Sequence, residues 1–286
     1  MQDDDLRASS NIEDRRGMGG AARGGLGIGA VLVLCLIGWA TGIDPRLLIG
    51  GAEMVTGSGQ PQSVQSAGHQ GTPADATGQF VARILGESED VWSQVLPQQA
   101  NVQYQRPILV LYSGLTQSAC GAAQSAMGPF YCPLDRKVYL DTSFFQDMQQ
   151  KLGGGGKFAD AYVITHEVGH HVQNLLGILP KVQQAQRAAG SEARANAISV
   201  RTELQADCLA GVWAYYMNQR HANIDQNDVQ QALNTAAAIG DDRLQRASRG
   251  TAVPDSFTHG TSEQRMHWFS TGLQSGKIDA CNTFRS

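Results

Sequence analysis

The hydrophobic and polar positions divide the chain into four regions of different character. Residues 1–23 are polar, rich in aspartate and arginine, and predict a disordered tail. Residues 24–43 carry no charged side chain, and a run of about 20 apolar and small residues is long enough to cross a lipid bilayer as a helix. Residues 44–78 are rich in Gly, Ser, Gln and Pro, which predicts a flexible linker. A folded domain is therefore expected over residues 79–286.

Within this domain the apolar positions recur first at helical and then at strand spacing. A helix is predicted over residues 79–97. Strands are predicted over residues 106–112, 129–132 and 137–141, and a turn at 133–136 joins the last two.

Beyond residue 142 the pattern is almost wholly helical. Helices are predicted over residues 143–152, 160–177, 191–219, 225–240 and 262–273. The first of these stops at the glycine run 153–156, which predicts a hinge or loop. A few strands followed by many helices indicate a mainly helical α+β domain with a small sheet.

The charge balance adds one exclusion. The chain of 286 residues has a formal net charge of −4 and a sequence pI of about 6.0. Its lysines and arginines form no basic run or stripe. We therefore expect no nucleic-acid partner.

The uncharged segment 24–43 is best explained as an uncleaved transmembrane anchor. A cleaved signal peptide needs small residues at its cleavage site, and residues 39–42 (WATG) make a poor one. A buried core helix would be amphipathic, whereas this segment is apolar all round. Four arginines precede it, but only Arg46 follows before Arg83, so the N-terminus is expected in the cytoplasm and the domain outside it.

Residues 165–171 (THEVGHH) contain the pattern H-E-x-x-H. His166 and His170 are four residues apart, so they lie within about 40° of each other around a helix and can bind one Zn²⁺ from the same face. Glu167 then lies beside the metal and can take a proton from its water. The plain alternative is a surface helix that happens to carry these residues, because five positions alone are only moderately specific.

A catalytic zinc usually has three protein ligands, so a third ligand is expected outside this pattern. The extended pattern with a later glycine and histidine is excluded, because Gln173 and Leu176 occupy those positions. His171 is excluded as well, since it points roughly 140° away from His166 around the helix.

Glu203 is the better candidate for the third ligand. Asp207 follows four residues later on the same predicted helix, so both carboxylates face the same way. One can bind the metal while the other accepts the free ring N–H of a ligand histidine. The alternative is a solvated pair of like charges, which the apolar neighbours Leu204, Leu209 and Trp213 make less attractive.

His259 precedes the last predicted helix, which Thr261 or Ser262 can cap. A histidine in this position either donates a hydrogen bond to the developing oxyanion of a tetrahedral intermediate or only braces the loop. Both interpretations stay open.

The number and position of the cysteines bear on the cellular compartment of the domain. Cys35 lies in the uncharged segment, which leaves Cys120, Cys132, Cys208 and Cys281 in the domain. An even number in a domain expected outside the cytoplasm favours disulfides, and no C-x-x-C spacing indicates a redox or zinc-ribbon site. We prefer Cys120 with Cys132, which closes a short loop, and then Cys208 with Cys281; the alternative is four buried free thiols.

Together these residues resemble the neutral zinc metallopeptidases of bacteria, of the YpfJ type. The matching segments are 13–16 (EDRR), 24–43, 128–133 (GPFYCP), 166–173, 203–213 and 259–265. The resemblance implies a zincin-type domain in which His166, His170 and Glu203 bind one Zn²⁺ and Glu167 is catalytic. The Glu203/Asp207 spacing is also similar to that of thermolysin-like peptidases, in which the glutamate binds zinc and the aspartate supports a histidine.

The expected protein is therefore a zinc metallopeptidase, an endopeptidase in class, that spans the bacterial inner membrane once, with its domain facing the periplasm or the cell exterior. Its expected partners are the bilayer, through residues 24–43, and a peptide or protein substrate that a strand near Tyr131 or Val138 can pair with. One rival is a zinc-binding scaffold without turnover, against which Glu167 argues, because a structural site needs no base. The other is zinc-dependent hydrolysis of a cell-wall amide, which the sequence does not separate from proteolysis.

Overall fold

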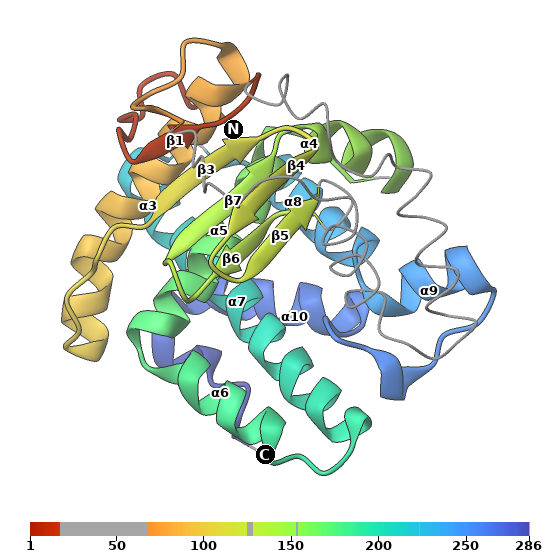
Figure 1. The fold of residues 1–286 in the computed structure, drawn as a ribbon. Coiled ribbons are helices and arrows are strands. Elements are labelled where there is room, and N and C mark those ends of the chain that lie inside the picture. Colours follow the sequence, from red (N-terminus) through yellow and green to blue (C-terminus); the bar gives the residue numbers. More distant parts are fainter. Residues whose placement is uncertain (18–67, 125–127, 153, 223, 286) are drawn as a thin grey trace, which may run out of the picture. The chain divides into compact units, whose positions relative to one another are not determined.

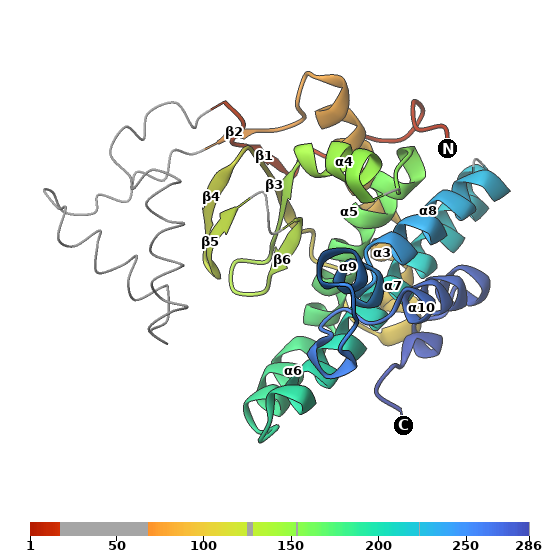
Figure 2. The same ribbon diagram turned by 90° about the vertical axis from the view of Figure 1, so that its right-hand side faces the viewer.

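The computed structural model describes residues 1–17, 68–124, 128–152, 154–222 and 224–285 (Figure 1). Met1–Arg16 and Gly68–Ser286 form one compact unit. It has the mainly helical α+β architecture that the sequence predicts. The strands gather on one side of helix α5 (Lys157–Leu175), and helices α7, α8 and α10 lie on the other (Figure 2).

Five strands form a mixed sheet in the order β2-β1-β3-β7-β6. They are β1 (Ile12–Asp14), β2 (His69–Gln70), β3 (Ile108–Tyr112), β6 (Phe130–Cys132) and β7 (Lys137–Asp141). Strands β1, β3 and β7 are parallel, and β2 and β6 run antiparallel at the two edges. A separate hairpin pairs β4 (Leu115–Ser118) with β5 (Gly121–Gln124). The three predicted strands are thus confirmed as β3, β6 and β7.

The other helices are α3 (Ala76–Ala100), α4 (Ser143–Asp147) continued by the π-helix η2 (Met148–Leu152), α6 (Ile178–Arg187), α7 (Glu192–His221), α8 (Gln226–Ala238), α9 (Asp241–Arg249) and α10 (Ser262–Ser275). Two short 3₁₀ turns are η3 (Pro254–Ser256) and η4 (Ile278–Cys281). Each predicted helix is confirmed with shifted ends, but α6 and α9 were not predicted. Pro180 suggests a helix end in the sequence, yet it occupies the first turn of α6, where a missing N–H costs no hydrogen bond.

Helix α5 is the central element, and it is buried on almost every side. Its residues Val168 and Val172 are fully inaccessible to solvent. Gly169 faces α7 so closely that a Cβ there would lie 3.0 Å from the carbonyl oxygen of Ala206. Any side chain at residue 169 would therefore push α5 and α7 apart, and these are the two helices that carry the candidate metal ligands.

The N-terminal residues are part of the fold. Ile12 in β1 is fully buried and pairs with Leu109 of the parallel strand β3. Leu6 and Ser9 are also buried. The prediction of a disordered tail over residues 1–23 is therefore wrong for residues 1–16. A three-residue strand with one apolar side chain has no periodicity that would reveal it in the sequence.

The predicted anchor at residues 24–43 and most of the predicted linker lie outside the described residues. Among the residues that the structure does describe, no helix has the length and apolar character needed to cross a membrane. The linker prediction is wrong for its last residues, because β2 begins at His69 and α3 at Ala76. The second part of the folded unit thus begins at Gly68 and not at residue 79.

Both preferred cysteine pairs are confirmed as disulfides. Cys120 is bonded to Cys132, next to the end of β6, with their Cα atoms 5.8 Å apart. Cys208 is bonded to Cys281, with a Cα–Cα distance of 5.4 Å, and this bridge ties α7 to the C-terminal turn η4. A bridge that closes a loop of 73 residues stabilises the folded state by about 4 kcal/mol in the chain-entropy account.

Candidate metal centre

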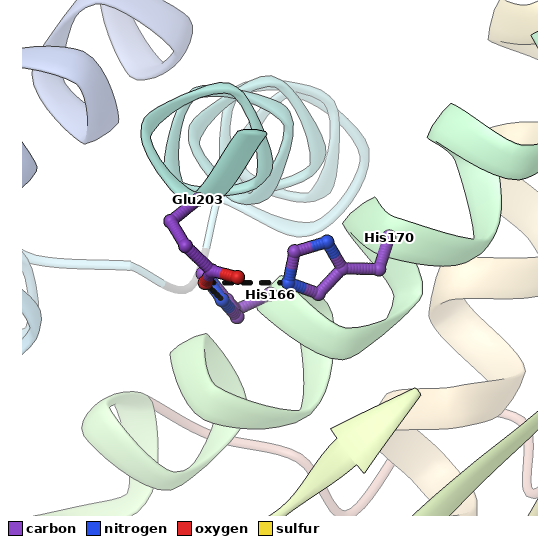
Figure 3. Close-up of side chains that lie close together, drawn as sticks. All are labelled: His166, His170 and Glu203. Atoms are coloured by element: carbon purple, nitrogen blue, oxygen red, sulfur yellow. Dashed lines mark hydrogen bonds and ion pairs between the residues drawn. The ribbon is translucent and has the colours of Figure 1, made fainter. Parts of the chain in front are cut away.

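Three side chains from two helices meet at one point, as the sequence predicts. His166 and His170 project from one face of α5, and Glu203 reaches them from α7 (Figure 3). The Oε2 atom of Glu203 lies 3.1 Å from Nε2 of His166 and 3.4 Å from Nε2 of His170. All three candidate ligand atoms lie within 4.8 Å of one another.

The spacing of these donor atoms fits a zinc ion. Two ligand atoms bound to a tetrahedral zinc at 2.0–2.1 Å are about 3.3 Å apart. The two nitrogen-to-oxygen distances of 3.1 and 3.4 Å bracket that value. Two imidazole nitrogens and one carboxylate oxygen are also the donor set of a catalytic zinc site that keeps a position open.

Both histidines have their other ring nitrogen engaged, which leaves Nε2 available for a metal. Nδ1 of His166 lies 2.8 Å from Oδ1 of Asp207, and Nδ1 of His170 lies 2.8 Å from Oε1 of Gln173. A carboxylate or amide oxygen only accepts hydrogen bonds, so each Nδ1 carries the proton. The Gln173 amide is itself oriented, because its Nε2 donates to the backbone oxygen of Thr202. The predicted second role of Asp207, supporting a histidine, matches this arrangement.

Asp207 is the centre of a buried network that the sequence did not reveal. Its side chain is fully buried and accepts hydrogen bonds from Nε and Nη2 of Arg265, each at 2.9 Å. The hydroxyl of Tyr162 donates to the same carboxylate. Arg265 lies on α10, so this network fixes α5, α7 and α10 to one another behind His166.

The charges of the site favour a cation. Burial lowers the pKa of His166, but Asp207 and Glu203 outweigh it and raise that pKa to about 10. Burial raises the pKa of Glu203, but the two histidines outweigh it and hold the pKa well below the usual range. The same carboxylates that favour the protonated form of both histidines would also stabilise a divalent cation bound at their Nε2 atoms.

Glu167 lies in the same cleft as the three candidate ligands. It is next to His166 on α5 and is 7 % exposed. Burial raises its pKa, an effect that the neighbouring His166 and His170 oppose. A carboxylate whose pKa moves toward neutrality is a better general base near pH 7 than an exposed one.

The cleft has a volume of about 540 Å³, and its walls are mostly apolar. Phe130 and Tyr131 of the edge strand β6 form one side, and Leu179 and Val182 of α6 form another. Among the described strands β6 pairs only with β7, so it is an edge strand of the sheet, and it lines the same cleft as the three candidate ligands.

His259 also lines this cleft, and Asp241 holds it in place. One oxygen of Asp241 accepts backbone N–H bonds from Thr258, His259 and Gly260 at 2.6–3.0 Å. The other oxygen lies 3.2 Å from Nδ1 of His259, which assigns the proton to that nitrogen. Burial raises the pKa of Asp241, but the bonds from the 258–260 loop outweigh it and lower the pKa overall. No sequence pattern pointed to Asp241, because it begins α9, a helix that was not predicted.

His171 is not a ligand, in agreement with the geometric argument from the sequence. Its side chain turns away from the metal centre, toward the hydroxyl of Tyr131 and the backbone oxygen of Gln105. Burial lowers its pKa to about 4, so the ring is neutral near pH 7. His171 therefore fastens α5 to the β6 strand that forms the cleft wall.

Two histidines on one helix, a glutamate on a later helix and a second glutamate beside them in a cleft are the arrangement typical of a zinc metallopeptidase. The sequence profile of the family described as "Putative neutral zinc metallopeptidase" matches residues 1–284. The chain belongs to this family. The match extends across the N-terminal residues as well as the site.

Two relatives illustrate the breadth of the family. The "Uncharacterized protein YpfJ" of Escherichia coli strain K12 is 48 % identical over 288 residues, which cover 97 % of this chain and 96 % of the relative. The "Uncharacterized protein Rv2575" of Mycobacterium tuberculosis strain H37Rv is 47 % identical over 227 residues, 74 % of this chain and 73 % of the relative. No solved structure matches the chain significantly.

Proposed function

We propose that the protein is a zinc-dependent endopeptidase with one Zn²⁺ per chain, held by Nε2 of His166, Nε2 of His170 and a carboxylate oxygen of Glu203. The observation that carries this proposal is the spacing of these three donors together with Glu167 beside them in the same cleft. When bound, zinc supplies a Lewis acid that polarises the substrate carbonyl and makes water acidic enough to deprotonate near pH 7.

The chain's own residues then carry the proton and position the substrate. Glu167 accepts a proton from the attacking water and returns it to the leaving amine as the peptide bond breaks. Asp241 keeps the proton of His259 on Nδ1. Nε2 can therefore donate a hydrogen bond to the developing oxyanion only when both ring nitrogens carry a proton.

The cleft favours an extended peptide as substrate. β6 is at the edge of the sheet among the described strands and lines the cleft, and a peptide can add to such an edge as a further strand. The apolar walls near Leu179 and Val182 suit a bulky apolar side chain next to the scissile bond. These two features support peptide hydrolysis over the hydrolysis of a cell-wall amide.

We also propose that the protein is attached to a bilayer through residues 24–43 and that its folded unit works outside the cytoplasm. The uncharged length of that segment supports attachment. Two disulfides support an oxidising compartment, because cytosolic glutathione keeps such cysteines reduced.

The direct test uses the full chain, zinc-loaded, on casein and on a mixed peptide library. We expect the wild type to cleave peptides, to lose activity to a zinc chelator and to regain it with added zinc. Glu167→Gln should bind zinc equally well but cleave about 10²- to 10⁴-fold more slowly, the usual contribution of a general base. The exposed Glu192→Gln on α7 is the matched control and should behave as wild type.

Two results would contradict the proposal. Zinc-loaded wild type that cleaves no peptide but hydrolyses a peptidoglycan amide would indicate the amidase. A wild type that binds zinc and hydrolyses neither substrate would indicate the scaffold.

A further inference from the structure

Residues 1–16 complete the sheet of the folded unit. Strand β1 lies between β2 and β3, with Ile12 opposite Leu109 and Asp14 opposite His69. Figure 1 shows this red segment beside the strand β3 that it extends. Because β1 is an inner strand, β2 has its place in the sheet only while β1 is docked.

The N-terminal segment supplies hydrogen-bond donors to a buried carboxylate of α3. Glu89 of α3 is fully buried, and its carboxylate accepts hydrogen bonds from Ser9 Oγ at 2.6 Å, Asn11 Nδ2 at 2.7 Å and Arg7 Nη2 at 2.8 Å. All three donors come from the N-terminal segment. Without that segment the carboxylate would lose these partners, which is among the costlier changes a folded protein can undergo.

Ion pairs of Glu13 and Arg16 also hold β1 in place. Glu13 is 6 % exposed and pairs with Arg15 at 2.7 Å and with Lys137 of β7 at 2.8 Å. Arg16 bridges Asp14 and Asp75, the residue that caps α3. The segment is thus joined to β7 and to α3.

The chain leaves the folded unit and returns to it at neighbouring positions. Asp14 and His69 are directly opposite each other in an antiparallel pair. Arg16 and Gly68, the residues of the folded unit on either side of residues 17–67, therefore lie next to this pair.

A chain that crossed a bilayer once between these points would separate residues 1–16 from residues 68–286. A second crossing would be needed to reunite them. Residues 24–43 are about one span in length, and residues 44–67 contain Asp44, Arg46 and Glu53 among Gly, Ser and Gln, so they provide no second apolar run. The predicted single span and the docked strand β1 exclude each other.

We infer that residues 1–16 lie on the same side of the membrane as the rest of the folded unit. This inference replaces the predicted orientation, in which the N-terminus is cytoplasmic and the domain is outside, with one in which both lie on the same side of the membrane. This inference does not depend on peptidase activity.

The test places single cysteines on the full-length chain in intact cells, in a Cys35→Ser background. Asp5→Cys reports on the N-terminal segment, and Gln274→Cys on α10 reports on the domain; both parent side chains are exposed. Each variant is treated with a membrane-impermeant maleimide before and after permeabilisation. We expect the two cysteines to give the same labelled fraction, either both in intact cells or both only after permeabilisation.

A paired-cysteine variant tests whether β1 is docked. Asp14→Cys with His69→Cys should form an intramolecular disulfide on mild oxidation of membranes, because directly opposite residues in an antiparallel pair have the required Cα separation. Asp14→Cys with Gln274→Cys is the control and should form none. Labelling of only one of the two single-cysteine variants in intact cells would overturn the inference, and so would failure of the 14–69 bridge.

Discussion

Nδ1 of His166 lies 2.8 Å from Oδ1 of Asp207, one helical turn beyond Glu203 on α7. The two carboxylates therefore contact the two nitrogens of the same ring: Asp207 lies at Nδ1 and Glu203 at Nε2. Asp207 fixes the tautomer and direction of His166, and Arg265 fixes Asp207 in turn. The metal site is thus positioned by a chain of contacts that runs from α10 through α7 to α5.

The first prediction concerns this chain of contacts. Asp207→Asn should weaken zinc binding about 10- to 100-fold, the usual effect of losing an outer partner of a ligand histidine. It should also lower the free energy of unfolding by roughly 3–5 kcal/mol, because Arg265 is 3 % exposed and would lose its charged partner. Zinc titration and urea unfolding of the full chain measure the two effects, with the exposed Asp279→Asn as control. Unchanged zinc affinity would remove Asp207 from the site.

The second prediction concerns Asp241. Asp241→Asn should lower kcat by about 10-fold or more with little change in zinc content, because it releases the loop that holds His259. His259→Ala should have a similar effect, and the double variant should be no worse than either single change. Steady-state kinetics and zinc analysis provide the comparison, with the exposed Asp255→Asn as control. A full loss of activity in Asp241→Asn with normal activity in His259→Ala would show that the loop only braces the fold.

The third prediction concerns pH and stability. Asp160 in the first turn of α5 has an oxygen with no hydrogen-bond partner among the described residues, and burial raises its pKa from 3.8 to about 7. The folded state therefore holds a proton that the unfolded state has released between about pH 4 and pH 7. The stability that depends on this proton is complete below pH 4 and is lost as pH rises to 7, by up to roughly 4 kcal/mol.

Asp160→Asn removes this dependence, since an amide does not ionise. Urea unfolding at pH 5 and pH 8 should show a smaller difference for the variant than for the wild type, and the variant should be the more stable of the two at pH 8. Asp255→Asn serves again as the exposed control. A variant that keeps the wild-type pH dependence would show that Asp160 is not its source.

The parts of the site that the sequence predicted are those that local geometry determines. His166, His170 and Glu167 follow from helical spacing within five residues. Glu203 and Asp207 follow from the same rule on one later helix, and the apolar residues beside them indicated that this face is buried. The strands β3, β6 and β7 were predicted because each carries enough apolar positions to show a pattern.

The parts that were missed arise only from tertiary contacts. Tyr162 and Arg265 are 103 residues apart in sequence and both contact Asp207. No local sequence pattern predicts such a contact. Asp241 acts on a loop 17–19 residues away. Strand β1 has a single buried apolar residue, and its stability comes from pairing with β3 and from the polar bonds to Glu89, which only the folded chain provides.

The docked N-terminus has a practical consequence for every experiment above. A chain shortened to residues 79–286 would lose β1, β2 and the donors to the buried Glu89 carboxylate. We expect such a fragment to be unstable even if its metal ligands are intact. Loss of activity in that fragment would say nothing about the site, so the full chain is required.

The central claim is that Glu203 completes a zinc site with His166 and His170, and zinc affinity of the Glu203→Ala variant tests it most directly. We expect affinity to fall by more than about 100-fold, because even an outer partner is worth 10- to 100-fold. Glu192→Ala, an exposed glutamate on the same helix, should bind zinc as the wild type does. Zinc affinity that is unchanged in Glu203→Ala would contradict the assignment of the third ligand and with it the proposed site.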